Sequence, residues 1–351
     1  MWHIRAAAII LLLGAVGLAC VPAQATHDDE AGALDGPKYS PYDEDPIWAN
    51  RDTMLFISGR PCAGEPKGVA VFAVGVDGAD LRRVSPRGYY CMRASCRSPL
   101  AIVWSFDIAA NTTHTCLLDL QSGKLTQLVL RFDAASLLFG ASDDELLCEA
   151  YGRTGGTSLR GVRVDGTGHV RAQWPLLASD RHATHPSISP DGKRLAYVQQ
   201  AETGRCQIMV CPLLGTSVGA ATSVRSVEEG SVSYYWLADS QRILHYTHAG
   251  QWITNVDTGT TQDYGVYLKE QGKLPPTVVG HVTSLTPNPF DTNRMACRVS
   301  HQKGPGLIGV YIAVMDFDGG NFRQLTFETP EAGIPYAYDK QFDVPVDSGL
   351  K

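Results

Sequence analysis

The feature that most constrains the fold of this chain is an internal repeat. Its clearest copy is HPSISPDGKRLAYV (185–198), in which two extended runs are separated by the turn residues Pro190, Asp191 and Gly192. Weaker copies follow one another at steps of 46, 46, 49, 48 and 52 residues, counted from the first apolar residue after each turn. Those first residues are Met54, Leu100, Leu146, Leu195, Ile243 and Met295. The sequence therefore contains six units of similar length.

A second sequence feature recurs with the same period: each unit has an extended run that ends near Asp or Gly before a turn. The closest pair, AVGVDGADLRRVS (73–85) and VMDFDGGNFRQLT (314–326), aligns without a gap and places Asp318 and Gly319 in the second of the two turns. Each unit holds up to four strand candidates and no convincing helix, since β-branched and aromatic residues lie between Gly, Pro, Asp and Asn.

The turn chemistry of the clearest copy predicts that its two runs pair as antiparallel strands. Pro190 presets the backbone for a turn, Asp191 can bond the following backbone, and Gly192 tolerates a positive φ. A period in the forties with four strands per unit is typical of a propeller blade, because packed blades bury faces that a single sheet leaves exposed. The strand-rich composition disfavours repeats of paired helices. We predict an all-β fold, a six-bladed β-propeller of four-stranded antiparallel blades.

Residues 1–25 have the pattern of a signal peptide. His3 and Arg5 precede the apolar run AAAIILLLGAVGLA, and the small residues at 23 and 25 fit a cleavage site. The run is shorter than the ~20 residues that span a bilayer, and no later stretch is apolar enough to do so. A weaker alternative is a lipid anchor at Cys20, in GLAC. We expect a periplasmic or secreted protein without a membrane span.

The remaining chain divides into an N-terminal extension (26–45), the propeller (46–327) and a C-terminal tail (328–351). Removal of the signal takes away Arg5 and moves the formal net charge from −6 to −7, with 29 Lys and Arg against 36 Asp and Glu. A mildly acidic chain has no electrostatic reason to bind nucleic acid.

Eight cysteines remain after cleavage, and an even count in an exported chain permits disulfides. Cys91 and Cys96 flank the loop candidate MRAS and could form a bridge. Cys206 and Cys211 are five positions apart on one strand candidate, an odd offset, so they are predicted to point to opposite faces. For most of the cysteines we expect a buried thiol in a strand.

The clearest copy (185–198) and the stretch GVYIAVMDFDGGNFRQLT (309–326) resemble the repeats of TolB-type β-propellers. The resemblance extends over residues 46–327 and implies the propeller fold. TolB itself carries an additional N-terminal α/β domain, and no such segment fits between the signal and Met54. A place in the Tol envelope machinery is therefore not expected.

Three further patterns are expected to be ordinary loops and turns. GTSVG (215–219) fits the nucleophile-elbow formula with Ser217 at its centre, but that elbow needs a strand, a sharp turn and a helix. GPGLIG (304–309) fits a dinucleotide formula, but a strand candidate follows it instead of a helix. DFDGGN (316–321) offers oxygen ligands to calcium, and a hairpin turn is the favoured interpretation.

The stretch GHVTSLTPNPFDTNRMACRVSHQKGP (280–305) resembles part of the oligogalacturonate lyases, a second propeller family. That resemblance implies β-elimination on pectin fragments, with His185 as the base and His281 in a site for a divalent metal such as Mn or Ca. His301 and Gln302 would add ligands. The tail EAGIPYAYDKQFDVPVDSGLK has no histidine to complete such a site, which leaves donors such as Asp339.

Two functions follow from these patterns. The favoured one is a non-enzymatic scaffold without a cofactor, which binds a protein or a glycan at the channel mouth and on the loops around it. The alternative is a metal-dependent polysaccharide lyase that uses the channel histidines.

Overall fold

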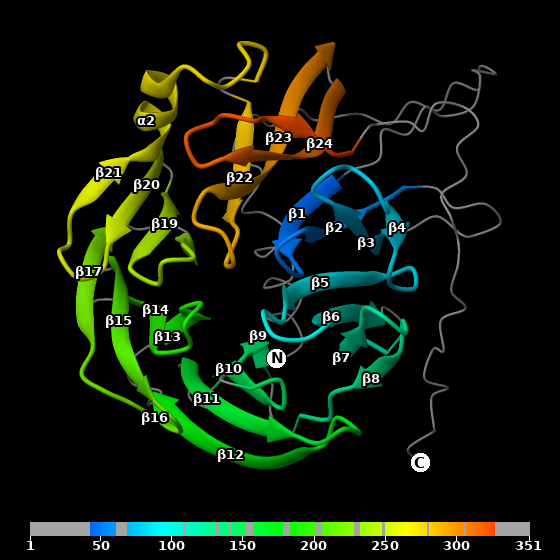
Figure 1. The fold of residues 1–351 in the computed structure, drawn as a ribbon. Helices are drawn as coiled ribbons and strands as arrows, with labels where there is room; N and C mark the ends of the chain where they lie inside the picture. Colours follow the sequence, from blue (N-terminus) through cyan, green and yellow to red (C-terminus); the bar gives the residue numbers. More distant parts are fainter. Residues whose placement is uncertain are drawn as a thin grey trace, which may run out of the picture. The chain divides into compact units, whose positions relative to one another are not determined.

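The structure is a computed structural model, and the residues that it describes belong to one compact unit, Ser40–Lys351. They are residues 43–60, 69–107, 110–130, 134–140, 142–151, 157–177, 183–200, 205–227, 232–247, 250–278, 281–304 and 307–326. They form six antiparallel sheets arranged in a ring (Figure 1). The prediction of an all-β, six-bladed propeller with four-stranded blades is confirmed.

In each blade the strands follow chain order from the centre of the ring outward (Figure 1). Blade 1 contains β1 (Asp43–Trp48), β2 (Thr53–Ser58), β3 (Ala70–Gly75) and β4 (Arg82–Arg83). Blade 2 contains β5 (Tyr89–Ala94), β6 (Leu100–Asp107), β7 (Thr112–Asp119) and β8 (Leu125–Gln127). Blade 3 contains β9 (Ala134–Phe139), β10 (Glu145–Tyr151), β11 (Thr157–Val164) and β12 (Val170–Leu177). The first strand thus begins inside the segment 26–45 that the sequence assigned to an N-terminal extension.

The second half of the ring repeats this order. Blade 4 contains β13 (Ala183–Ile188), β14 (Arg194–Gln200), β15 (Cys206–Leu214) and β17 (Thr222–Val227), with the short β16 (Ser217–Val218) paired to the end of β15. Blade 5 contains β18 (Ser233–Trp236), β19 (Arg242–Thr247), β20 (Gly250–Asn255) and β21 (Thr261–Asp263). Blade 6 contains β22 (Val282–Pro287), β23 (Arg294–Gly304), β24 (Leu307–Asp316) and β25 (Arg323–Gln324).

The expectation that the repeat units contain no helix is wrong for blade 5, which is followed by one short helix. α2 (Tyr264–Gln271) begins at the cap residue Asp263, whose side chain accepts a hydrogen bond from the backbone three residues later, and ends at Gly272, with φ 62°. It buries Leu268 in the core shared with blade 6. Eight residues with two buried positions give too weak a helical period to be recognised in the sequence. Within the described ranges no helix has the length and apolar character needed to span a bilayer.

Six clusters of buried apolar side chains fill the six interfaces between neighbouring blades. Strand β2 shows how the sequence produces them. Leu55 lies in the cluster shared with blade 2, whereas Met54 and Phe56 lie in the cluster shared with blade 6. Successive side chains of a strand point to opposite faces. Each blade therefore buries both faces, which explains why one unit of the repeat cannot fold alone.

The described cysteines are free thiols, so the possible bridge between Cys91 and Cys96 is absent. Five of them are buried: Cys91, Cys116, Cys148, Cys211 and Cys297. Cys206 and Cys211 lie on opposite faces of β15, as predicted, because each contacts a different interface cluster. Burial raises the pKa of Cys297 to about 12, which keeps this thiol protonated at neutral pH.

Pro190, Asp191 and Gly192 lie in the turn between β13 and β14. Gly192 has a φ of 75°, and its N–H donates to the carbonyl oxygen of Ser189 at 2.8 Å. The carboxylate of Asp191 accepts a hydrogen bond from the backbone of Lys193 at 3.0 Å. A residue with a Cβ is strained at this φ, whereas glycine adopts it freely.

Asp318 and Gly319 lie in the turn between β24 and β25, the third and fourth strands of blade 6, where Gly319 has a φ of 82°. The carboxylate of Asp318 accepts a hydrogen bond from the backbone of Gly320 at 2.9 Å and forms an ion pair with Lys273. The side chain of Asn321 donates to Asp316 at 2.7 Å. These internal partners are those of a hairpin turn.

The ring closes between blades 1 and 6 without a shared strand among the described residues, because each blade uses consecutive strands. Side chains hold this seam instead. The indole N–H of Trp48 donates to the carbonyl oxygen of Thr286 at 2.9 Å, and the amide of Asn288 donates to the carbonyl oxygen of Arg51 at 3.0 Å. An exposed ion pair joins Asp52 to Arg294 of blade 6 at 3.3 Å.

A buried ion pair lies at the other end of β1. Asp43 and Arg60 pair with each other, and each side chain is only 1% exposed. Burial raises the pKa of Asp43, while the nearby Arg60, Ser58 and Thr326 lower it in part. Thr326 belongs to the end of blade 6, where its hydroxyl accepts a hydrogen bond from the backbone of Ile312 at 2.9 Å. The charge of Asp43 is therefore compensated by groups from both sides of the seam.

We expect the stability of the propeller to fall in acid partly through His245. This imidazole is fully buried in β19, where Nε2 shares a hydrogen bond with the hydroxyl of Thr254 at 3.0 Å. Burial, with a smaller effect of Arg225, lowers the pKa of His245 to about 4. A histidine in the unfolded chain has a pKa near ~6.5, so the unfolded state binds more protons between these values.

The contribution of neutral His245 is complete above about pH 7 and is lost at roughly 1.4 kcal/mol per pH unit between about pH 6 and 4. Urea unfolding from pH 7.5 to 4.5 measures this dependence. His245→Gln removes the titrating group, so its free energy of unfolding should change less steeply with pH than that of the wild type. Equal slopes for the two proteins would contradict the assignment.

Candidate binding site at the mouth of the channel

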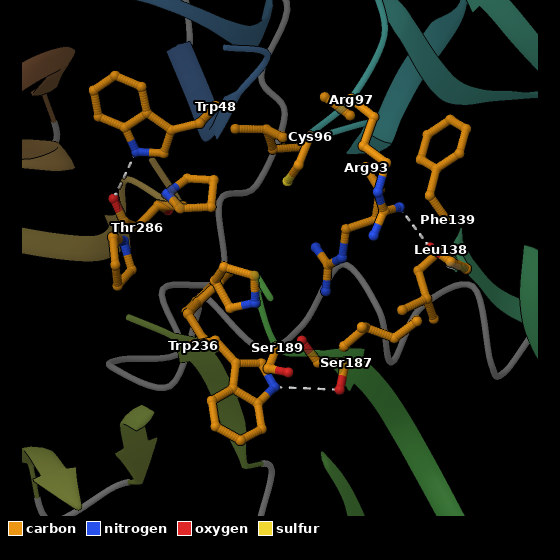
Figure 2. A pocket seen from close by; sticks show the side chains of 18 residues that line it. Trp48, Arg93, Cys96, Arg97, Leu138, Phe139, Ser187, Ser189, Trp236 and Thr286 are labelled. Atoms are coloured by element: carbon orange, nitrogen blue, oxygen red, sulfur yellow. Dashed lines mark hydrogen bonds between the residues drawn. The ribbon is translucent and has the colours of Figure 1, made fainter. Parts of the chain in front are cut away.

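The inner strands of all six blades end around one cavity of about 160 Å³ (Figure 2). Its lining includes one residue or more from every blade: Trp48, Arg93, Phe139, Ser187, Trp236 and Thr286. These residues lie at the C-terminal ends of β1, β5, β9, β13, β18 and β22. The cavity is therefore the mouth of the central channel at that end of the ring.

The walls of this mouth are rigid and largely apolar. Trp48 and Trp236 are 3% and 5% exposed, and each indole N–H donates to a carbonyl of the neighbouring blade. For Trp236 the acceptor is Ser187, at 3.2 Å (Figure 2). Pro190, Pro287 and Pro289 line the rim, where their rings fix φ and leave no N–H to be satisfied. The tryptophans thus hold adjacent blades together and do not present open ring faces.

Two arginines from blade 2 supply the positive charge of the mouth. Figure 2 shows the guanidinium of Arg93 directed into the middle of the pocket. Arg97 lies at the rim and donates from Nη1 to the carbonyl oxygen of Gly140 in blade 3, at 2.8 Å. Arg93 donates from Nη1 only to the carbonyl oxygen of its neighbour Met92, at 3.1 Å. Among the described residues, neither guanidinium has a carboxylate within ion-pair distance.

Asp45 and His185 project from the inner strands of blades 1 and 4, which face each other across the six-bladed ring. Both have left-handed backbone angles, with φ 49° and 51°, and both lie where the strand register shifts. Each is followed by proline. Such angles are costly for residues other than glycine, so the surrounding structure must hold them.

The charge of Arg93 reaches across the channel to both residues. The pKa of Asp45 is raised by burial and lowered in part by Arg298 and Arg93. Burial lowers the pKa of His185, and the charge of Arg93 lowers it further. Both residues are exposed to solvent, although neighbouring protein atoms desolvate their charged forms. These effects agree with the position of the Arg93 guanidinium in the middle of the pocket (Figure 2).

His185, the suggested base, is held by neighbours from blades 3 and 5. Its backbone N–H donates to the carboxylate of Glu149 at 3.0 Å, and its carbonyl accepts a hydrogen bond from the hydroxyl of Tyr234. Nδ1 lies 3.1 Å from the hydroxyl of Thr184. Within the described part of the chain, neither ring nitrogen of this imidazole has a carboxylate partner.

The other suggested lyase residues belong to blade 6. His281 precedes β22, is exposed, and has Nδ1 at 3.1 Å from the carbonyl oxygen of Ser300. His301 and Gln302 lie in β23, where their backbones face those of Gly309 and Ile308. Their side chains lie outside the described part of the structure.

Asp339, Cys20 and the segments 1–25 and 328–351 also lie outside the described residues. Within the described ranges, no group of three or more His, Cys, Asp and Glu side chains is placed to hold a metal ion. The structure therefore supplies no ligand set for the lyase alternative, which stays a prediction from the sequence.

Ser217 lies in the hairpin between β15 and β16, where its hydroxyl donates to the carbonyl oxygen of Leu214 at 3.2 Å. The pattern at 304–309 joins β23 to β24, so a strand follows it. Neither place has the strand-to-helix turn that its enzyme formula requires.

Sequence reasoning missed Asp45 and Arg93. A signal for Asp45 exists, because DEDPIW and ATHPSI place Asp45-Pro46 and His185-Pro186 at the same point of two inner strands. For Arg93 the sequence offers no comparable mark.

No protein-family model matches this chain, and no curated protein matches it. In fold it is similar to a crystal structure of puromycin hydrolase (S511A mutant complexed with PGG), at TM-score 0.54 and 11% identity, covering 86% of this chain and 57% of that one. Prolyl oligopeptidase B from Galerina marginata is similar at TM-score 0.54 and 9% identity, covering 82% and 51%.

A putative TolB from Agrobacterium tumefaciens matches at TM-score 0.49 and 14% identity, covering 78% of this chain and 88% of that one. The chain spans about half the length of the peptidases that it matches. At such identities the likeness establishes the fold alone. The class of this protein is the six-bladed β-propeller.

Proposed function

We propose that this propeller is an exported, non-enzymatic binding scaffold that holds a segment of a partner protein at the mouth of its channel. The observation that carries the proposal is the mouth itself, where six blades build an apolar cavity and two arginines face it, neither paired with a carboxylate among the described residues. The signal-peptide pattern of residues 1–25 supports a periplasmic or secreted location.

The geometry of the mouth favours a protein segment over a glycan. Its volume of about 160 Å³ is close to the about 150 Å³ of a cavity that holds benzene, so it accommodates one side chain or chain end. Sugar rings need open aromatic faces and many polar partners, whereas Trp48 and Trp236 are buried. Apolar walls with a few placed polar groups are typical of sites for peptide and small-molecule ligands.

Panning of random 12-residue peptides against the purified protein tests the proposal. We expect enrichment of peptides that bind the wild type and lose binding to Ser187→Trp or the smaller plug Ser187→Leu, because both fill the mouth. Ser226→Trp is the matched control, since Ser226 is exposed on the outer strand β17. Thermal melting of each variant checks that the fold is retained.

Failure of the mouth variants to weaken any enriched peptide would overturn the proposal. A glycan arm uses the same variants with oligogalacturonate and neutral oligosaccharides. Binding of a glycan that is lost in the plugged variants would replace the protein segment as the ligand. An unsaturated product from oligogalacturonate with added manganese, lost in His185→Ala, would support the lyase alternative instead.

A further inference from the structure

We infer that the guanidinium of Arg93 binds a single carboxylate group of the ligand at the mouth of the channel. The inference rests on the proposed function and specifies the chemistry of the ligand. The shared chemistry is one monoanionic carboxylate, which an acidic side chain or the C-terminal end of a peptide can supply.

The first argument is the unused hydrogen-bonding capacity of Arg93. Its side chain has five N–H donors, and the described residues accept from it only at Met92. The guanidinium is half-buried and lies in the middle of the pocket (Figure 2). A planar guanidinium fits a carboxylate with two parallel hydrogen bonds, and such charge-assisted bonds are strong in a partly dry site.

The second argument is the framework that fixes the position of Arg93. The residue follows a register shift in β5, and its strand packs at a ring interface with blade 1. Arg97, four residues later, is bonded to blade 3 through Gly140 and lies close to Gly192 of blade 4. Arg97 is therefore part of the rim. Arg93 is the arginine whose guanidinium a ligand inside the mouth would contact.

The third argument concerns the charge of the ligand. Asp45 is exposed on the inner strand β1, and the positive charge of Arg93 acts on its carboxylate. Repulsion by this carboxylate grows with the negative charge of the ligand. A phosphate group with a charge near about −2 is repelled about twice as strongly as a carboxylate. The attraction by Arg93 doubles as well, so Asp45 weakens anion binding at Arg93, and its removal should strengthen the binding of phosphate more than that of acetate.

Small anions test this assignment without any peptide. Acetate is titrated into the full chain, with NMR detection of arginine side-chain resonances. We expect a saturating shift in the wild type that weakens at least about tenfold in Arg93→Gln and less in Arg93→Lys. Arg205→Gln, an exposed arginine away from the mouth, is the matched control and should leave acetate binding unchanged. Equal binding of acetate by Arg93→Gln and the wild type would overturn the inference.

Asp45→Asn gives a readout that a merely structural role of these residues would not produce. Removal of the negative charge should strengthen acetate binding several-fold and should strengthen the binding of inorganic phosphate by a larger factor. Acetate and phosphate binding that is unchanged in Asp45→Asn would contradict the role given to Asp45.

Enriched peptides then identify the source of the carboxylate. Each peptide is compared as the free acid, as the C-terminal amide and with its Glu and Asp residues replaced by Gln and Asn. Loss of binding in the amide assigns the chain end, and loss after side-chain replacement assigns an acidic residue. Peptides that bind the mouth equally well without any carboxylate would overturn the inference and leave the proposed function intact. If acetate binds at Arg93 but panning enriches no peptide, the carboxylate site is supported and the proposed function is contradicted.

Discussion

Arg60→Met is expected to lower the free energy of unfolding by about 3–5 kcal/mol, because it leaves the carboxylate of Asp43 buried without its cation. Both side chains of the pair are 1% exposed, so water cannot replace the lost partner. The methionine keeps most of the volume of the arginine stem, which limits the contribution of a cavity. Urea unfolding at pH 7 measures the change.

The double variant with Asp43→Leu and Arg60→Met should be more stable than Arg60→Met alone, since it removes the unpaired charge as well. Arg171→Met breaks an exposed pair with Asp165 and should leave the unfolding midpoint almost unchanged. A loss of less than about 1 kcal/mol for Arg60→Met would show that Asp43 is neutral or hydrated in the folded protein.

Trp48→Ala is expected to destabilise the propeller by about 3–5 kcal/mol and to loosen the seam between blades 1 and 6. The indole is 3% exposed, fills the interface cluster of that seam and bonds to Thr286. No described strand crosses this interface, so side-chain contacts carry the closure. Hydrogen exchange should show faster exchange in β1, β23 and β24 than in the other blades.

Trp236→Ala is the matched control for this effect. Trp236 occupies the corresponding end of β18 and bonds to Ser187, but blades 4 and 5 are consecutive in the chain. Its replacement should cost a similar amount of stability, whereas the increase in exchange should stay near blades 4 and 5. Uniform exchange across the ring in Trp48→Ala would mean that the seam is no weaker than the other interfaces.

The sequence by itself determined the repeated architecture. A period in the forties, strand candidates between turn residues and the Pro190-Asp191-Gly192 turn are local properties, and a propeller is assembled from local hairpins. The prediction of opposite faces for Cys206 and Cys211 held for the same reason, since side chains alternate along any strand. Helix α2 was not predicted, because two buried positions in eight residues do not produce a recognisable helical period in the sequence.

Only the tertiary structure decided which residues meet in the channel and across the seam. Asp45, Arg93 and His185 lie in different blades, and their common position depends on the closure of the ring, which no local pattern encodes. The contact of Asp43 in blade 1 with Thr326 at the end of blade 6 likewise joins the first and last blades. Such contacts depend on the curvature and number of blades, because the same strands in an open array would leave these charges in water.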